Sequence, residues 1–439
     1  MHDKHTSQPS PVSRRQFLKH STLAATAATL SFPNILHAQN KKAFNAAIIG
    51  IGGRGGGAGR NFLDAAKEVG VEAKVVAVAD IFPEQANRGQ SAYGVPASKC
   101  FSGFDSYLKA LAVPEVNYAI IAAPPGFRPA HFKACIAAGK HTFTEKPVCV
   151  DGPGARIMYA AGEEAKKKGL KVAAGTQRRH QKGYIETIKR IQDGAIGDVT
   201  ACRAYWVNGG PIWHRGMKGD TDLARQINNW YHYIWLSGDH IAEQHVHNID
   251  VCNWVVGSHP VKAWGMGARQ QLADKPGEIW DNFAVEFEYE NGVRMASYCG
   301  QIKRDFSSVS EAIVGSKGTA NPAGNIKPKE GEGWRFRDKA QDPYVQEHID
   351  LMNAIINDTE LNETKQVTDS TLTALMGREA AYNGGVVEWN DMVESKFAYG
   401  PELLYTDAGK MQWGAFRTLK PPMPGTHDIF KDQPNLPVI

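Results

Sequence analysis

Two short segments of this chain carry side chains suited to moving a proton. Lys146 lies in a Glu-Lys-Pro triplet, and further along the chain Glu243 and His247 stand four positions apart. If residues 241–254 form a helix, Glu243 lies one turn before His247 on the same face and can orient its imidazole. The ordinary pKa of histidine lies near neutrality, which makes His247 a candidate general base. The oxidation of an alcohol requires such a base, because the hydroxyl loses its proton as the carbon loses hydride.

A glycine-rich turn near the start of the chain has the pattern of a dinucleotide-binding site. Residues 50–55 read Gly-Ile-Gly-Gly-Arg-Gly, with an apolar run at 43–50 before them and a helical pattern at 57–69 after them. The first glycine permits the tight turn, the second lets the backbone approach a pyrophosphate, and the third allows close helix–strand packing. The predicted cofactor contacts in this turn are Gly50, Ile51, Gly52, Gly53, Arg54 and Gly55.

Asp80 follows the glycine turn at the distance expected in dinucleotide-binding folds, at the end of a second apolar run over residues 73–79. A carboxylate at this place accepts hydrogen bonds from ribose hydroxyls and repels a 2′-phosphate. NAD is therefore the expected cofactor. The basic residues Arg54 and Arg60 keep NADP open as the alternative.

The elements that must position these residues alternate along the chain. Further helical patterns and apolar runs follow one another at 104–112, 117–123, 130–138 and 141–144. Strands separated by helices imply a parallel sheet with right-handed crossovers, and ligands bind at the carboxyl ends of such strands. Asp80, Ala123-Pro124 and Glu145-Lys146 are expected at that edge.

The sequence resembles the glucose–fructose oxidoreductase/inositol dehydrogenase (Gfo/Idh/MocA) family over about residues 43–400. The matching segments are 50–55, 123–125 with His131, 140–147, 175–179, 194–197 and 243–250. The resemblance implies an α/β Rossmann domain followed by an α+β domain with a large, mostly antiparallel, open sheet. The open face of that sheet would cover the nicotinamide or mediate assembly into a homo-oligomer, expected to be a dimer or tetramer.

The resemblance also implies roles for single residues. Lys146 would lie near both nicotinamide and substrate, holding the hydroxyl or relaying its proton. Glu243 stands where the family usually has Asp, which lengthens the reach of the carboxylate toward His247. The further cofactor contacts implied are Ala123, Pro124, His131, Glu145 and Lys146.

Residues 230–235 and their surroundings are dense in aromatic side chains, which suit the C–H faces of sugar rings. The predicted substrate contacts are Arg178, Tyr231, Trp235 and His240. The spacing of Asp239, His240, Glu243 and His247 would also suit a metal ion. No metal is expected, because the family needs none and no third firm ligand is evident.

The chain divides into four predicted parts. They are a signal segment at 1–38, the Rossmann domain at 43–165, the α+β domain at 166–400 and a proline-rich tail at 401–439. Within the second domain, strands are predicted at 261–268, 282–289 and 292–300, amphipathic helices at 343–357 and 370–382, and an exposed loop at 315–332.

The amino terminus has the features of a twin-arginine export signal. Residues 13–19 read Ser-Arg-Arg-Gln-Phe-Leu-Lys, and an uncharged stretch too polar for a stable membrane span follows. Residues 1–38 hold most of the formal charge of +4; without them 46 basic and 45 acidic residues remain. A near-neutral body does not indicate nucleic acid as a partner. The six cysteines are scattered and form no CxxC pair. The export signal predicts that the protein is located in the periplasm.

That location bears on the expected activity, because free NAD is not expected outside the cytoplasm. The sequence therefore predicts an exported NAD(P)-dependent oxidoreductase that acts on a hydroxyl of a sugar or glycoside and retains its cofactor. One alternative is a redox-neutral, NAD-dependent glycoside hydrolase or lyase. Relatives with that activity commonly lack the lysine of the Glu-Lys-Pro triplet, which this chain keeps. A second alternative is a non-catalytic sugar-binding protein.

Overall fold

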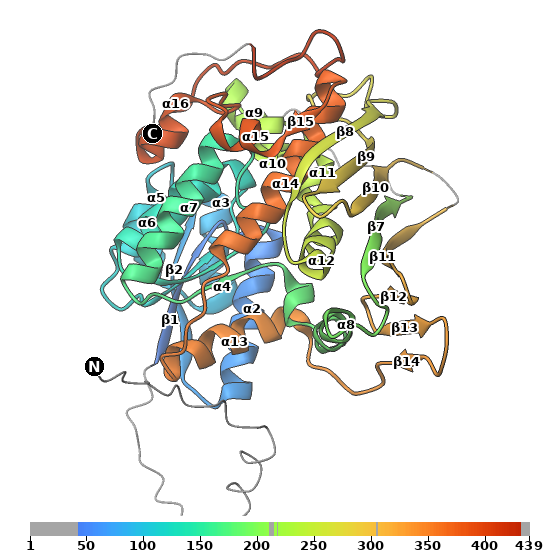
Figure 1. The fold of residues 1–439 in the computed structure, drawn as a ribbon. Coiled ribbons are helices and arrows are strands. Elements are labelled where there is room, and N and C mark those ends of the chain that lie inside the picture. Colours follow the sequence, from blue (N-terminus) through green and yellow to red (C-terminus); the bar gives the residue numbers. More distant parts are fainter. Residues whose placement is uncertain (1–42, 210–214, 217, 304–305, 432–439) are drawn as a thin grey trace, which may run out of the picture. The chain divides into compact units, whose positions relative to one another are not determined.

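A computed structural model describes residues 43–209, 215–216, 218–303 and 306–431 of the chain (Figure 1). The predicted signal segment lies outside these residues. Among the helices that are described, none is both long enough and apolar enough to cross a membrane.

The first sheet has six parallel strands in the order β3-β2-β1-β4-β5-β6. They are β1 (Phe44–Ile49), β2 (Ala73–Asp80), β3 (Cys100–Ser102), β4 (Tyr118–Ile121), β5 (His141–Thr144) and β6 (Val172–Ala174). The predicted Rossmann architecture is confirmed. The strand order reverses between β1 and β4, and ligands of such sheets bind beyond the carboxyl ends at that point. The sixth strand continues the sheet past residue 165.

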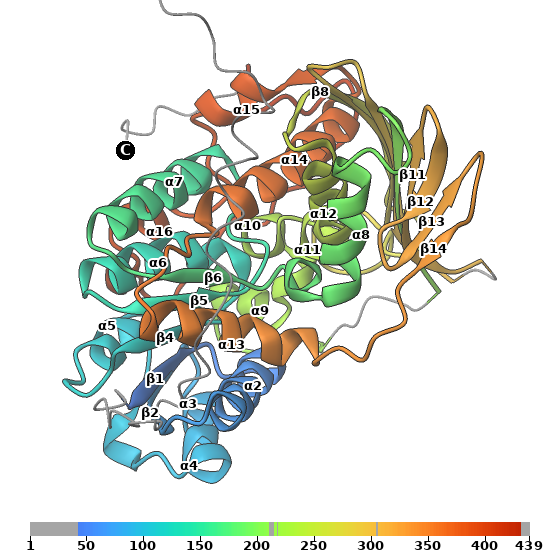
Figure 2. The ribbon, with the colours of Figure 1, turned by 60° about the horizontal axis from the view of Figure 1, so that its bottom comes forward.

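Alternate side chains of β4 enter different hydrophobic clusters on the two faces of this sheet. Tyr118 and Ile120 pack toward α2 and α13, whereas Ala119 and Ile121 pack toward α6 and α7. Figure 2 shows α2 and α13 together beside the sheet, with α6 and α7 away from them. The helices of this domain are α2 (Gly53–Val69), α3 (Pro83–Ala86), α4 (Arg88–Tyr93), α5 (Ser106–Leu111), α6 (Arg128–Ala137), α7 (Gly152–Lys167) and, from far along the chain, α13 (Pro343–Ile356).

The second sheet has nine strands in the order β14-β13-β12-β11-β7-β10-β9-β8-β15. They are β7 (Val199–Asn208), β8 (Pro260–Ala268), β9 (Asn282–Tyr289), β10 (Arg294–Gln301), β11 (Ser308–Gly315), β12 (Gly318–Asn321), β13 (Asn325–Pro328), β14 (Trp334–Arg335) and β15 (Val387–Glu388). Every pair is antiparallel except β7 with β10. The predicted large, mostly antiparallel sheet is therefore confirmed.

One face of the second sheet packs on α12 and α14, and the other is open. Phe287 and Met295 lie on the covered face and are fully buried. On the open face, Met266 of β8 and Tyr298 of β10 both pair with Ala284 of β9, the strand between them. Their side chains are 73% and 45% exposed. The remaining helices are α8 (Lys182–Gln192), α9 (Asp222–Asn228), α10 (Ile234–Ser237), α11 (His240–Glu243), α12 (Val246–Val256), α14 (Thr364–Asn383), α15 (Trp389–Glu394) and α16 (Glu402–Thr406).

Two predicted elements differ in the structure. Residues 315–332, expected as an exposed loop, contribute β12 and β13 to the edge of the second sheet. Ala320 and Ile326 are buried there. The glycines suggested a loop, but one of them, Gly324, forms the turn between β12 and β13, with φ of 133°. The helix expected over 370–382 is α14, which is buried on all sides rather than amphipathic. It lies between α7 and the second sheet, so each face meets protein (Figure 1).

Candidate active site

One cavity brings together most of the predicted cofactor-binding and proton-transfer residues. It has a volume of about 570 Å³ and lies where β1, β2, β4 and β5 end, with residues of α11 and α12 in its wall. The predicted residues that line it are Gly50, Gly52, Gly53, Arg54, Gly55, Asp80, Ala123, Pro124, Glu145, Lys146, Glu243 and His247. We call this cavity the cleft.

The backbone of the glycine turn requires glycine at two places. Gly50 has φ of 87°, and a Cβ there would lie 2.5 Å from the backbone nitrogen of Ala123. A Cβ at Gly55 would lie 1.8 Å from the carbonyl oxygen of Gly50, so α2 can approach β1 this closely only without a side chain. At Gly52 and Gly53 a Cβ would meet no atom within 4 Å. The uncapped first turn of α2 is therefore open toward the cleft, where it attracts an anion.

Asp80 places a carboxylate beside this turn at the end of β2. Its Oδ2 accepts a hydrogen bond from the backbone of Ile51 at 3.0 Å, and its Oδ1 accepts one from Phe82 at 3.1 Å. Burial raises the pKa of Asp80 to about 6, although both hydrogen bonds oppose the shift. An open helix N-terminus next to a carboxylate acceptor fits a dinucleotide, with the first turn of α2 holding the pyrophosphate and Asp80 holding a ribose.

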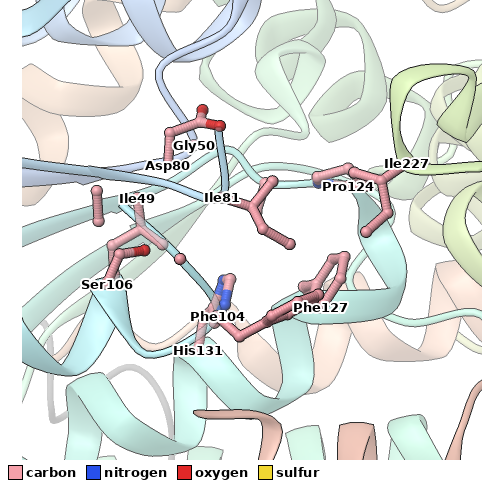
Figure 3. A pocket seen from close by; sticks show the side chains of 13 residues that line it. Ile49, Gly50, Asp80, Ile81, Phe104, Ser106, Pro124, Phe127, His131 and Ile227 are labelled. Atoms are coloured by element: carbon pink, nitrogen blue, oxygen red, sulfur yellow. The ribbon is translucent and has the colours of Figure 1, made fainter. Parts of the chain in front are cut away.

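A smaller cavity of about 50 Å³ adjoins the cleft at Asp80 (Figure 3). Its lining is mostly apolar and includes Phe104, Phe127 and the predicted cofactor contact His131. Nδ1 of His131 is buried without a hydrogen-bond partner among the described residues, and burial lowers the pKa of the ring to about 3. A neutral imidazole among apolar side chains suits the adenine end of a dinucleotide.

Lys146 and Glu243 contact each other in the cleft. The Lys146 ammonium donates a hydrogen bond to the carbonyl oxygen of Glu243 at 2.5 Å and lies 3.5 Å from its Oε1. The two side chains are only 11% and 9% exposed. Burial raises the pKa of Glu243, while Lys146 and Arg128 oppose the shift. The position of the lysine thus depends on the backbone of the segment that carries Glu243.

The helix predicted over residues 241–254 is interrupted between its two candidate residues. Glu243 ends α11, and α12 begins at Val246, so Glu243 and His247 do not share one continuous helix face. Polar side chains occupy the interruption: Gln244 donates to Oε2 of Glu243 at 2.5 Å, and His245 bonds the hydroxyl of a buried serine at 2.8 Å. Both candidate residues still line the cleft.

His247 is held as a neutral imidazole. Burial lowers its pKa well below the ordinary 6.5, and the neighbouring cations Lys146 and Arg178 lower it further. Its ring stacks on Trp206 with 6.0 Å between ring centres, and its Nδ1 is buried without a hydrogen-bond partner among the described residues. A neutral ring that lines the cleft can accept a proton.

Arg54 links the glycine turn to the loop that carries Lys146. Its Nε donates to Glu145, its Nη2 lies 3.8 Å from Glu347, and its guanidinium carbon lies 4.7 Å from the centre of the Tyr344 ring. Glu145 also accepts a hydrogen bond from the backbone of Lys146 at 3.3 Å. With its charge engaged by two carboxylates, Arg54 does not present a free cation for a 2′-phosphate, which favours NAD.

Arg128 is a site residue that the sequence analysis missed. It is buried in α6, and its guanidinium donates to the carbonyl oxygens of Ala123 at 2.8 Å and Pro147 at 2.6 Å. Burial lowers its pKa to about 10, although nearby carboxylates oppose the shift. It therefore ties the loop after β4 to the loop after β5. A lone arginine just before the helical pattern predicted at 130–138 gives no sign of such a role in the sequence.

The four side chains predicted to bind substrate do not line the cleft. Arg178 is paired with a buried carboxylate at 2.5 Å. The hydroxyl of Tyr231 bonds Nδ1 of His240 at 3.0 Å, and the indole of Trp235 donates to Gln226 at 2.7 Å. Each is more than nine-tenths buried. They fill the interior because their polar groups find partners within the protein.

Other side chains of the same region face the cleft instead. The lining includes Trp206, Arg215, Asn228, Trp230 and Gln244. The aromatic-rich part of the sequence thus contributes some residues to the lining of the cleft. The aromatic density could not separate the rings that face the cleft from those that pack beneath it, because both kinds occur within a few positions of each other.

The residues whose spacing would suit a metal are committed to other contacts. Asp239 accepts hydrogen bonds from the backbone of Trp280 at 2.7 Å and from the hydroxyl of Tyr382. In the part of the chain that the structure describes, no group of three or more His, Cys, Asp or Glu side chains could hold a metal ion.

Comparison with protein families gives two adjacent matches. Residues 44–176 match the model described as an oxidoreductase family with an NAD-binding Rossmann fold, GFO/IDH/MocA. Residues 184–321 match the model of the GFO/IDH/MocA C-terminal domain. The two matches together span most of the chain.

Among curated proteins, the chain is 26% identical over 315 residues to inositol 2-dehydrogenase of Gluconacetobacter diazotrophicus, covering 69% of this chain and 85% of that one. Among solved structures, scyllo-inositol dehydrogenase of Lactobacillus casei with NAD(H) and scyllo-inositol has a TM-score of 0.61 and 22% identity, over 80% of this chain and 100% of that chain. Aldose-aldose oxidoreductase of Caulobacter crescentus has a TM-score of 0.62 and 19% identity, over 79% and 99%. Both structures share the fold described above.

Proposed function

The chain belongs to the Gfo/Idh/MocA family of NAD-binding oxidoreductases, and we propose that it is an exported dehydrogenase that keeps its NAD bound while it oxidises a hydroxyl of a sugar, glycoside or cyclitol or reduces the corresponding carbonyl. One observation carries the proposal: Lys146, Glu243 and His247 line the same cleft as the glycine turn and Asp80. The inositol dehydrogenase relative supports a polyhydroxylated ring as the substrate class.

The residues of the cleft divide the work of such a reaction. The glycine turn and Asp80 would hold NAD, which would supply the hydride acceptor for the carbon that is oxidised. His247, which is neutral because its pKa is lowered, accepts the hydroxyl proton. Lys146 donates a hydrogen bond to the same oxygen and stabilises its developing negative charge. Glu243 holds the lysine in place through its carbonyl and carboxylate oxygens. Trp206 and Trp230 offer aromatic faces to the ring of the substrate.

Tight retention of the cofactor is supported by a segment after α16 that packs against two aromatic rings lining the two cavities. Trp413 stacks on Phe82 at 5.6 Å and contacts Phe104 at 4.8 Å between ring centres, and both rings lie beside Asp80. The next residue, Gly414, accepts a backbone hydrogen bond from Leu223 of α9 at 3.2 Å. The segment thus ties the second domain to the loops that would surround the adenosine.

Export and assembly are parts of the proposal with their own support and tests. Arg14 and Arg15 give the segment 13–19 its twin-arginine pattern, so replacing both by Lys should leave the protein in the cytoplasmic fraction of its host. The open face of the second sheet offers Met266 and Tyr298 to a second copy. Met266→Lys should lower the molar mass measured by light scattering if that face joins the copies.

The deciding experiment uses protein purified without added nucleotide. The protein is denatured, the released cofactor is identified and quantified, and native protein is then offered a panel of sugars, glycosides and cyclitols. We expect near-stoichiometric NAD(H) and reduction of the bound NAD by a member of the panel. An empty protein that turns over only with added NAD would contradict retention. Cleavage of a glycoside without net reduction would favour a redox-neutral lyase, and no turnover of any kind would favour a sugar-binding protein.

A further inference from the structure

Helix α14 lies directly behind the two segments that carry Lys146 and Glu243. It contacts α7, α11 and α12 and the second sheet, and it runs between them in Figure 1. Of its 20 residues, 16 are buried. Several of the buried residues are polar and form hydrogen bonds with segments that carry active-site residues. Thr371 accepts from the backbone of Val148, two residues after Lys146, at 3.3 Å, and Ser370 donates to Asp250, three residues after His247, at 2.8 Å.

Arg378 of this helix bridges the two segments. Its Nη1 donates to the carbonyl oxygen of Val150 at 3.0 Å and to that of Gly238 at 3.1 Å. Val150 follows Lys146 by four residues, and Gly238 precedes Glu243 by five. The arginine is fully buried, and its remaining donors bond the carboxylate of Glu379 at 2.6 and 2.9 Å, which compensates its charge. A planar fork with several fixed donors can hold two carbonyls and a carboxylate at once.

Tyr382, one turn further along α14, holds the residue next to Gly238. Its hydroxyl donates to Oδ2 of Asp239, which also accepts from the backbone of Trp280 at 2.7 Å. Asp239 has φ of 73° and ψ of 167°, a backbone region adopted almost only by glycine. Such a conformation persists where surrounding contacts over-determine it, and Asp239 is fully buried with three donors on its carboxylate. Helix α11, which ends in Glu243, starts from this strained residue.

We propose that Arg378 and Tyr382 are positioning residues for the reaction, which hold the Lys146 loop and the Glu243 segment at the separation that lets the lysine bond the Glu243 carbonyl. The proposal rests on the dehydrogenase function proposed above. Neither residue touches the cleft, so each acts through the loops that it holds. Because the ammonium of Lys146 bonds backbone rather than only a mobile carboxylate, a shift of either segment moves the proton-transfer group itself.

The test compares three variants of the full-length protein. Arg378→Lys removes the fork but keeps the charge beside Glu379, and Tyr382→Phe removes only the hydroxyl on Asp239. The control is Thr368→Val, which lies fully buried in the same helix and loses a hydrogen bond to the carbonyl of Thr364 alone. For each, the measurements are bound NAD, kcat and KM of hydride transfer, and the rate at which an amine-reactive anhydride labels Lys146.

We expect both test variants to keep their NAD, to lose about 10- to 100-fold in kcat with KM little changed, and to label Lys146 faster, because small misplacements of reacting groups cost this much. Thr368→Val should match the unaltered protein in all three measurements. Equal kcat and equal labelling in the control and in Tyr382→Phe would overturn the proposal, and this variant decides it if Arg378→Lys does not fold. If the unaltered protein transfers no hydride, the proposed function fails, and the labelling rates alone decide the positioning role.

Discussion

The two ends of the cleft are built in different ways. The cofactor end consists mainly of backbone: the glycine turn, the uncapped start of α2 and a single carboxylate, all from within residues 50–80. The catalytic end consists of side chains from distant segments. Lys146 comes from the loop after β5, and Glu243 and His247 come from two separate helices of the second domain.

This difference decides how each end is kept in shape. Backbone at the cofactor end is fixed by local sterics, since glycine is required where a Cβ would collide. Side chains at the catalytic end are fixed by side-chain contacts between segments, such as those of the buried arginines Arg128 and Arg378, which hold loop carbonyls. We therefore expect the cofactor end to be disrupted by substitutions that enlarge a glycine. We expect the catalytic end to lose activity when a side chain is shortened or removed.

The largest effect should come from Lys146→Ala at the catalytic end. Loss of the ammonium removes a proton-transfer or oxyanion contact, and we expect hydride transfer to fall by about 10³-fold while NAD stays bound. Single-turnover reduction of the bound NAD measures the rate, and quantified cofactor measures binding. The exposed lysine of the neighbouring helix, Lys133→Ala, serves as the control. Loss of NAD along with activity in Lys146→Ala would show that the two ends are not separable.

His247→Asn should slow hydride transfer by about 10²-fold and change its pH dependence. A base works in its neutral form, so activity is present above its pKa and is lost as the pH falls through it. Burial and Lys146 lower the pKa of His247 well below 6.5. The acid limb of the normal rate profile should therefore lie well below pH 6.5 and should vanish in the variant. His259→Asn, whose ring stacks on Trp389 outside the cleft, should leave the profile unchanged.

Addition of one methyl group tests the cofactor end. A Cβ at Gly55 would lie 1.8 Å from the carbonyl oxygen of Gly50, so Gly55→Ala should lower the free energy of unfolding by about 1–3 kcal/mol, as overpacking does. Gly53→Ala adds the same methyl group where no atom lies within 4 Å, and its stability should not fall. Urea unfolding of cofactor-free protein measures both. Equal stabilities of the two variants would argue against the close approach of α2 and β1.

The smallest effect should be a pH dependence of NAD affinity. The pKa of Asp80 is raised to about 6 by burial, and the ionised carboxylate is the form that accepts hydrogen bonds from a ribose. Protonation below that pKa removes the charge, so affinity should fall by about tenfold as the pH drops from about 7.5 to about 5. Equilibrium titration with NAD at each pH measures it. Asp80→Asn should bind more weakly at neutral pH and should show a flat profile.

The fold and the cofactor end could be predicted from the sequence because their signals are local. Residues 50–55 and Asp80 lie within one strand–helix–strand unit, and the alternation of strands and helices continues through 144. The grouping of Lys146 with Glu243 and His247 came from the family resemblance rather than from spacing. The structure adds an interruption between Glu243 and His247 that the periodicity did not show.

The anchor Arg378 at the catalytic end could not be predicted, because its two loop contacts reach 228 and 140 positions along the chain. Arg378 stands in a stretch rich in small and apolar residues, and nothing nearby in the sequence marks Val150 or Gly238 as its partners. Tyr231 and Trp235, predicted as substrate contacts, are buried and do not line the cleft, whereas Trp206 and Trp230 do. Burial, which separates them, is a property of the assembled fold.

Helix α13 has a consequence for how the chain is made. It covers the first sheet beside α2, yet along the chain it follows every strand of the second sheet except β15. Tyr118 and Ile120 pack against Leu351 and Met352, which are synthesised more than 200 residues later. This face of the first sheet therefore stays incompletely covered until α13 has been made. The nucleotide-binding half cannot mature first and the second half afterwards. A fragment ending before residue 343 lacks α13, so it should expose this face of the first sheet and aggregate.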